Sequence, residues 1–150
     1  MRRLFLTFFY TGLSPKAPGT VGSLLALVLG VAIIRFVSLE TLFLASVLLT
    51  ILGIKHINAY ENDGGEHDDK SIVIDEVVGM WLALVLSSGS WIQIALSFLF
   101  FRLFDIWKPS LIGKIDAHVK GGLGVMGDDV LAGLVAGICS AGIFQLLTLV

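Results

Sequence analysis

The sequence predicts an all-α integral membrane helical bundle, with about five apolar helices and a short N-terminal interfacial or re-entrant segment. The first observation is composition: 56% of the residues are hydrophobic and 15% are charged, whereas soluble domains average about 45–50% and about 25%. The second is that the apolar residues fall in runs separated by short polar stretches. The third is that the charges fall almost entirely on one predicted side of the membrane. We expect residues 1–150 to form a single membrane-embedded domain.

The apolar runs are expected to be helices, in the order 20–37, 39–60, 72–86, 90–107 and 128–149. The first, second, fourth and fifth are long enough to cross a bilayer core, which needs about 17–25 helical residues. The third has about 15 residues and would be about 22 Å long. It is therefore expected to pack inside the bundle or to lie in thinned bilayer. Residues 4–13 are too short to span and are expected at the interface.

Local residues support the ends of these helices. Pro15, Pro18 and Gly19 interrupt the chain before the first helix, and Thr20 or Ser23 is expected to cap it. Pro109 ends the fourth helix because a proline disrupts the helical hydrogen bonds. Trp81, Trp91 and Trp107 suit the aromatic belts of a membrane protein.

The charges then predict an orientation. If the five helices cross in turn, the N-terminus and the loops 61–71 and 108–127 lie on one side. Of the ten Lys and Arg residues only Arg35 falls on the opposite side, and of the twelve acids only Glu40 does. Because cytoplasmic loops carry an excess of Lys and Arg, the charged side is expected to be cytoplasmic.

Six acids near helix ends on this side are the candidate metal ligands: Asp68, Asp75, Glu76, Asp105, Asp128 and Asp129. Ionisable groups at membrane depth are costly and are functional candidates. A divalent cation would relieve the repulsion among clustered carboxylates, and all-oxygen ligands suit Mg²⁺, Mn²⁺ or Ca²⁺. Capping is an alternative role for Asp128, and an ion pair with Arg102 is one for Asp105. Capping explains Asp75 and Glu76 less well, since they lie inside an apolar run.

Cations and helix starts on the same side suggest a phosphate site. Arg102 and Lys108 flank Asp105 in "FRLFDIWKP", where an Arg fork or a Lys ammonium could hold a phosphate. The helix start at Thr20 and Ser23 offers backbone N–H groups to an anion, and so do Gly121 and Gly122. The alternatives are an interfacial snorkelling role for Lys108 and a tight turn at the glycines.

Other site classes are excluded or left open. The single cysteine, Cys139, excludes an internal disulfide and a cysteine-based metal site. No basic patch suggests nucleic acid, and the net charge is −2. The expected partner is a phospholipid in the bilayer, and the oligomeric state stays open.

Four stretches together resemble the signature blocks of the phosphatidylglycerophosphatase A family: "GLSPKAPGTVGSL", "HDDKSIVIDEVVGMW", "FRLFDIWKP" and "GGLGVMGDDVLAG". The resemblance implies a Mg²⁺-dependent lipid phosphatase of the bacterial inner membrane. It would hydrolyse phosphatidylglycerophosphate to phosphatidylglycerol and phosphate, in a multi-pass phosphatase domain whose active site faces the cytoplasm. The family's acidic positions correspond to the six acids above, with Asp75, Glu76 and Asp105 as catalytic candidates beside Arg102 and Lys108. The chain departs from the family pattern after Pro109, where Ser110, Leu111 and Ile112 stand in place of an aromatic-proline-isoleucine run.

Three rival functions fit parts of the sequence. The main alternative is a membrane ion or metal transporter with a cytoplasmic acidic cluster, because intramembrane acids also mark ion pathways. The position of the acids at one face argues against it. A phosphotransferase acting on a CDP-lipid would need a different spacing of acids, and a noncatalytic scaffold would not explain Asp75 and Glu76.

Overall fold

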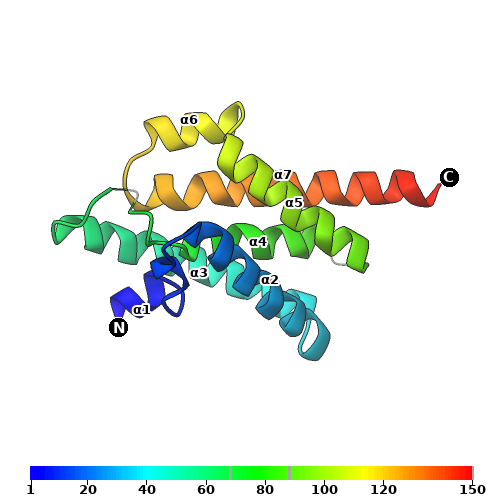
Figure 1. Cartoon of the computed structure of the whole chain (residues 1–150), viewed down its shortest axis with the longest axis horizontal. Helices are drawn as coiled ribbons and strands as arrows, with labels where there is room; N and C mark the ends of the chain where they lie inside the picture. Colours follow the sequence, from blue (N-terminus) through cyan, green and yellow to red (C-terminus); the bar gives the residue numbers. More distant parts are fainter. Residues whose placement is uncertain (68, 88, 150) are drawn as a thin grey trace.

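The computed structural model describes residues 1–67, 69–87 and 89–149, and these form a bundle of α-helices (Figure 1). The predicted all-α membrane fold is therefore confirmed. The elements in chain order are α1 (Arg2–Leu6), the 3-10 helix η1 (Thr11–Leu13), α2 (Pro18–Phe36), α3 (Leu39–Asn62), α4 (Ile74–Leu86), α5 (Trp91–Trp107), α6 (Leu111–His118) and α7 (Gly121–Thr148).

In the described part of the chain, three helices are long and apolar enough to cross a membrane: α2, α3 and α7. The other two predicted apolar helices are shorter. Helix α5 has 17 residues and α4 has 13, which correspond to about 26 Å and about 20 Å. The prediction of about five apolar helices is correct as an approximation. The two short helices, α4 and α5, pack against neighbouring helices.

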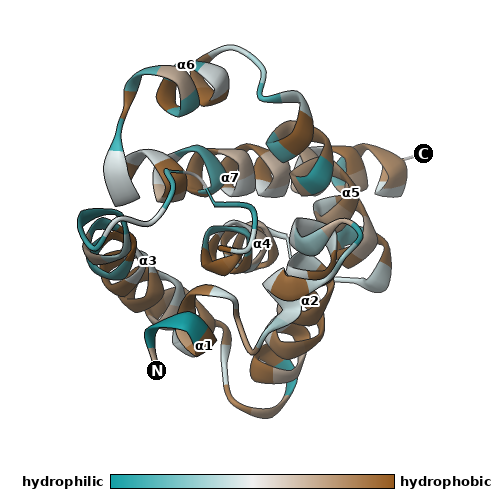
Figure 2. Ribbon diagram, turned by 60° about the vertical axis from the view of Figure 1, so that its left-hand side comes forward, coloured by the Kyte–Doolittle hydropathy of each residue, from teal (hydrophilic) through white to brown (hydrophobic). Residues whose placement is uncertain are grey.

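Helix α4 is the centre of the bundle. It packs against α2, α3, α5 and α7, and Figure 2 shows it end-on with the other helices around it. Every residue from Val77 to Leu84 is buried. Its apolar sequence therefore forms the core, and of the two alternatives expected for this short helix, packing inside the bundle is the one that the structure shows.

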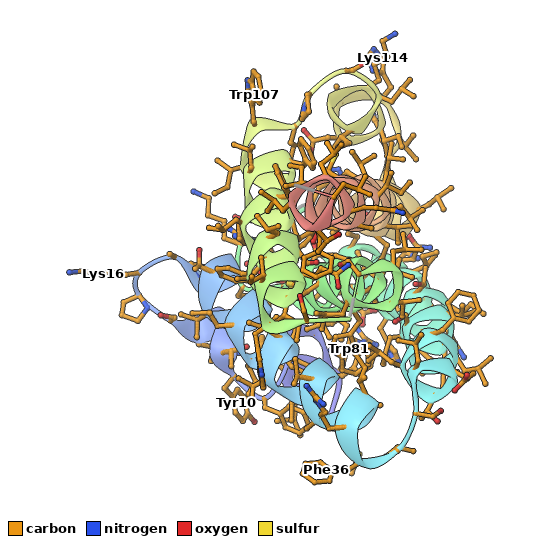
Figure 3. The ribbon with its side chains drawn as sticks, turned by 90° about the vertical axis from the view of Figure 1, so that its right-hand side faces the viewer. Tyr10, Lys16, Phe36, Trp81, Trp107 and Lys114 are labelled. Atoms are coloured by element: carbon orange, nitrogen blue, oxygen red, sulfur yellow. The ribbon has the colours of Figure 1, made fainter. Side chains whose placement is uncertain are left out.

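Trp81 belongs to this core and not to an aromatic belt. Its side chain is 6% exposed, and its indole Nε1 donates a hydrogen bond of 2.8 Å to the carbonyl of Ala26 in α2. Trp107, in contrast, projects from the surface of the molecule (Figure 3). The expectation of an aromatic belt is wrong for Trp81 because its helix is enclosed on all sides.

The segment between α5 and Asp128 contains more helix than expected. Residues 108–127 were expected to form a loop, but they contain α6 and the first two turns of α7. Helix α6 packs along α7 (Figure 1). Because α7 begins at Gly121, Asp128 lies inside a helix, and the alternative of a capping role for Asp128 is wrong.

Candidate active site

Parts of four helices meet and surround an open cavity of about 340 Å³. They are the N-terminal ends of α2 and α4, the C-terminal end of α5 and the early turns of α7. The cavity is lined by most of the site residues expected from the sequence: Thr20, Asp75, Glu76, Arg102, Asp105, Lys108, Asp128 and Asp129. The fold therefore gathers acids and cations from distant parts of the chain.

Three of the acids form a compact cluster. Oxygen atoms of Asp75, Glu76 and Asp129 lie within 4.8 Å of one another. Each residue has one buried oxygen with no hydrogen-bond partner among the described residues: Asp75 Oδ1, Glu76 Oε2 and Asp129 Oδ2. Buried polar atoms are nearly always paired, and close carboxylates repel one another. The cluster therefore fits a hard divalent cation, which would satisfy these oxygens and remove the repulsion.

Small residues bring the cluster together. Gly79 follows Asp75 by one turn of α4, and Gly133 follows Asp129 by one turn of α7. A Cβ atom on Gly133 would lie 2.8 Å from both Cα and the carbonyl carbon of Gly79, and one on Gly79 would lie 2.6 Å from the carbonyl oxygen of Asp129. The two backbones thus touch just below the carboxylates. Larger residues at this crossing would move the acids apart.

Arg102 lies beside the carboxylates, and its guanidinium is held in place through one of its nitrogens, Nη1. Its Nη1 donates a hydrogen bond of 3.2 Å to Ser23 Oγ and forms an ion pair with Asp105. Its buried Nε has no partner among the described residues. The ion pair predicted as an alternative for Asp105 is therefore present, and it does not remove either residue from the cavity.

The structure gives Ser23 a different position from the one expected. Its side chain is fully buried, donates a hydrogen bond of 2.7 Å to the carbonyl of Gly19 and accepts one from Arg102. Ser23 does not line the cavity. Ser23 therefore holds the Arg102 guanidinium from outside the cavity, and its direct contact with phosphate stays a prediction.

Lys108 points into the cavity from the end of α5. It is the C-cap in a left-handed conformation, with a φ of 46°, and Pro109 follows it. Its ammonium group donates a hydrogen bond of 2.7 Å to Asp128 and also pairs with Asp116. Burial lowers the pKa of Lys108, but the hydrogen bonds with Asp116 and Asp128 raise it by more, above its ordinary value. Lys108 is thus a fixed positive charge and not a snorkelling side chain.

The start of α2 presents backbone N–H groups to the cavity. Ala17 is the N-cap, in a left-handed conformation with a φ of 49°, and Pro18 occupies the first turn. Thr20 is therefore not the cap that the sequence suggested. Gly19 and Thr20 line the cavity, and first-turn N–H groups have no acceptor within their own helix. A Cβ atom at Gly19 would collide with Glu76 Oε1, so the glycine lets this helix start approach the carboxylates.

The predicted phosphate role of Gly121 and Gly122 is not supported. Neither residue lines the cavity. The N–H group of Gly122 donates a hydrogen bond of 2.6 Å to the side-chain Oδ1 of Asn58. Gly121 has a φ of 72°, so the tight turn that we considered as the alternative is correct there. Asp68 lies outside the described residues.

Sequence reasoning missed three charged residues near the site. Asp69 and Lys70 line the cavity, and Asp116 pairs with Lys108. The position of Asp69 and Lys70 directly after Asp68 in "HDDKS" was an available signal. Nothing in the sequence near Asp116 indicated its contact, because this contact depends on how α6 folds back.

The sequence comparisons point to one family. The profile of the phosphatidylglycerophosphatase A family matches residues 4–144. Phosphatidylglycerophosphatase A of Escherichia coli is 40% identical over 90% of this chain and 76% of its own length. The Haemophilus influenzae protein of the same name is 40% identical over 85% of this chain and 79% of its own length.

A third relative has a different name. It comes from Bacteroides thetaiotaomicron, its provisional name is phosphatidylinositol-3-phosphatase, and it is 41% identical over 85% of this chain and 84% of its own length. No solved structure matches the chain significantly. The profile match over nearly the whole chain and these identities show that this membrane protein belongs to the phosphatidylglycerophosphatase A family.

Proposed function

We propose that this chain is a Mg²⁺-dependent lipid phosphatase that hydrolyses phosphatidylglycerophosphate to phosphatidylglycerol and inorganic phosphate. The observation that carries the proposal is the carboxylate cluster of Asp75, Glu76 and Asp129, in a cavity that also contains Arg102 and Lys108. The acids can hold a metal cation, and the neighbouring cationic side chains can bind an anion. This combination suits the binding and hydrolysis of a phosphate ester. The names of two relatives with 40% identity support this substrate.

Asp75, Glu76 and Asp129 would hold the Mg²⁺, which would polarise the phosphoryl group and activate a water molecule. The chain's own groups act around it. Arg102 would offer its Nε, which has no hydrogen-bond partner among the described residues, to a phosphate oxygen, and Lys108 would contribute a fixed charge. The first-turn N–H groups of α2 are a third anion contact.

The balanced reaction needs only water. The water oxygen forms a bond to phosphorus, and the bond between phosphorus and the glycerol oxygen breaks in line with it. The leaving glycerol oxygen takes up a proton, and a nearby carboxylate accepts the proton that the water loses. The cations stabilise the charge on the phosphoryl oxygens during the transfer.

The location that we propose is the bacterial cytoplasmic membrane, with several crossings and the active site on the cytoplasmic side. The bacterial sources of the relatives support the membrane, and the bias of Lys and Arg towards one side supports the orientation. A site at the helix ends suits this reaction because the lipid tails stay in the bilayer while the phosphate meets water.

The transporter alternative is less well supported. The acids gather around the start of α4, and the next part of that helix, Val77 to Leu84, is buried and apolar. Within the described part of α4, no ionisable side chain continues the path towards the opposite side of the bundle. An ion pathway would need polar groups along its length.

The test is phosphate release from phosphatidylglycerophosphate by the purified protein in detergent, with Mg²⁺ and then with EDTA. We expect release with Mg²⁺ and none after chelation. Asp75→Asn should lower turnover by about a hundredfold or more, since it removes a proposed metal ligand. Glu66→Gln, which neutralises an exposed acid outside the cavity, is the matched control. No release by a folded wild-type protein would refute the proposal.

A further inference from the structure

A second cavity lies next to the candidate active site, beneath the N-terminal helix. It has a volume of about 370 Å³, and Arg2, Arg3 and Thr7 of the N-terminal segment line it opposite Tyr60 of α3. Asp69 and Ile72 line both this cavity and the acidic one. The two cavities are therefore neighbours, and the proposed reaction makes no use of the basic residues in the second.

Hydrogen bonds occupy Arg2 and Asp69 in the second cavity, so Arg3 is the positively charged side chain there that could bind an anion. Arg2 is occupied, because it donates a hydrogen bond of 2.5 Å to Asp63 and one of 3.2 Å to the carbonyl of Ala59. Asp69 accepts hydrogen bonds from the Tyr60 hydroxyl at 2.6 Å and from a backbone N–H at 2.8 Å. Arg3 is exposed, and within the described ranges it forms no hydrogen bond or salt bridge, although its charge helps to lower the pKa of the Asp69 carboxyl across the cavity. The cavity thus offers one guanidinium to an anion.

The opposite face of the same segment is apolar. Leu4, Phe5 and Phe8 line a third cavity of about 430 Å³, together with Ile74 and Trp81. The N-terminal segment therefore separates a polar cavity from an apolar one. A phospholipid has the same arrangement, with a charged headgroup next to its acyl chains.

We propose that Arg3 and the second cavity bind the phosphodiester group of the lipid whose terminal phosphate enters the acidic cavity. This inference rests on the proposed function. Phosphatidylglycerophosphate carries two phosphates, a diester next to the diacylglycerol and a monoester at its end. Two adjacent cavities, one for each phosphate, would select it over a lipid whose only phosphate is a monoester.

The experiment compares Arg3→Gln with the wild-type chain in detergent micelles of constant total charge. The probes are phosphatidylglycerol, which has the diester alone, and inorganic phosphate, each used as an inhibitor of hydrolysis. We expect Arg3→Gln to raise the inhibition constant of phosphatidylglycerol by about three- to tenfold, because a charge-assisted hydrogen bond is lost. The KM for phosphatidylglycerophosphate should rise similarly, while inhibition by inorganic phosphate should not change.

Lys114→Gln is the matched control, because Lys114 is an exposed cation on α6 that points away from the body of the protein (Figure 3). It should change neither inhibition constant. Equal weakening of both inhibitors by Arg3→Gln, or no change in either, would overturn the inference.

Native mass spectrometry of phosphatidylglycerol bound to the purified chain tests the second cavity without turnover. Binding by the wild type that Arg3→Gln weakens supports the inference, and binding that Arg3→Gln leaves unchanged contradicts it. If the wild type binds this lipid through Arg3 but hydrolyses no phosphatidylglycerophosphate, the proposed function fails and the diester site stands.

Discussion

Replacing Gly133 by alanine should separate α4 from α7 and disable the carboxylate cluster without changing any charge. The new Cβ atom would lie 2.8 Å from two backbone carbons of Gly79, whereas carbon atoms in contact lie about 3.5–4.0 Å apart. Backbone atoms cannot rotate away as a flexible side chain can. The helices must therefore move apart one turn below Asp75 and Asp129.

The magnitude follows from comparing two alanine variants of the same helix. Gly142 also lies in α7, but a Cβ atom there would meet nothing within 4 Å. Each Gly→Ala change gains about 1 kcal/mol of helix propensity, and this gain cancels in the comparison. What remains for Gly133→Ala is the cost of overpacking, about 1–3 kcal/mol. For a chain of this size, each kcal/mol shifts the unfolding midpoint by about 2–4 °C.

The assay is thermal unfolding in detergent together with phosphate release from phosphatidylglycerophosphate. We expect Gly142→Ala to be at least as stable as the wild type and fully active. Gly133→Ala should unfold at a lower temperature and lose most of its activity, and additional Mg²⁺ should restore part of it by binding the displaced carboxylates. Equal stability and equal activity of the two variants would show that the contact of α4 with α7 does not hold the site together.

Two further predictions concern charges around the site. Lys108→Met should destabilise the protein by about 3–5 kcal/mol in EDTA, because it leaves the buried Asp128 without its cation. Asp116→Asn, which removes the more exposed partner of Lys108, should cost less than about 1 kcal/mol. Equal unfolding midpoints of the two variants would contradict this prediction. Burial raises the pKa of Asp69, but the hydrogen bonds from Tyr60 and Ser71 and the charge of Arg3 together lower it to below its ordinary value of 3.8. The stability advantage of the wild type over Asp69→Asn should therefore be present above that pH and disappear as the pH falls through the lowered pKa. Unfolding midpoints from about pH 7 to about pH 3 measure it, and a constant difference would refute it.

The apolar helices were predictable because their signal is local. A run of apolar residues is recognisable without knowledge of its neighbours, and Pro109 marks a helix end for reasons of backbone geometry. The start of α7 was missed because glycines at 122 and 124 resemble a loop in sequence. They are tolerated in a helix because the backbones of neighbouring segments lie too close for a larger side chain.

The candidate site was predictable in its residue types but not in its partnerships. Acids inside apolar sequence were conspicuous, so Asp75 and Asp129 could be named. Ser23 was assigned to phosphate because a serine near a helix start is commonly a cap or an anion contact. Its actual contact with Arg102 joins residues 79 positions apart in the sequence. A local sequence pattern cannot predict a contact between residues that far apart.

The sequence by itself determined that this protein is an α-helical membrane bundle with carboxylates and cations at one end, because hydropathy and charge are properties of single residues and short segments. Only the tertiary structure decided which carboxylates share a cation site, which cation pairs with which acid, and that the N-terminal segment forms a second cavity. These features depend on how closely the helices approach and in which direction each side chain points. Backbone contacts such as the one between Gly79 and Gly133 fix both.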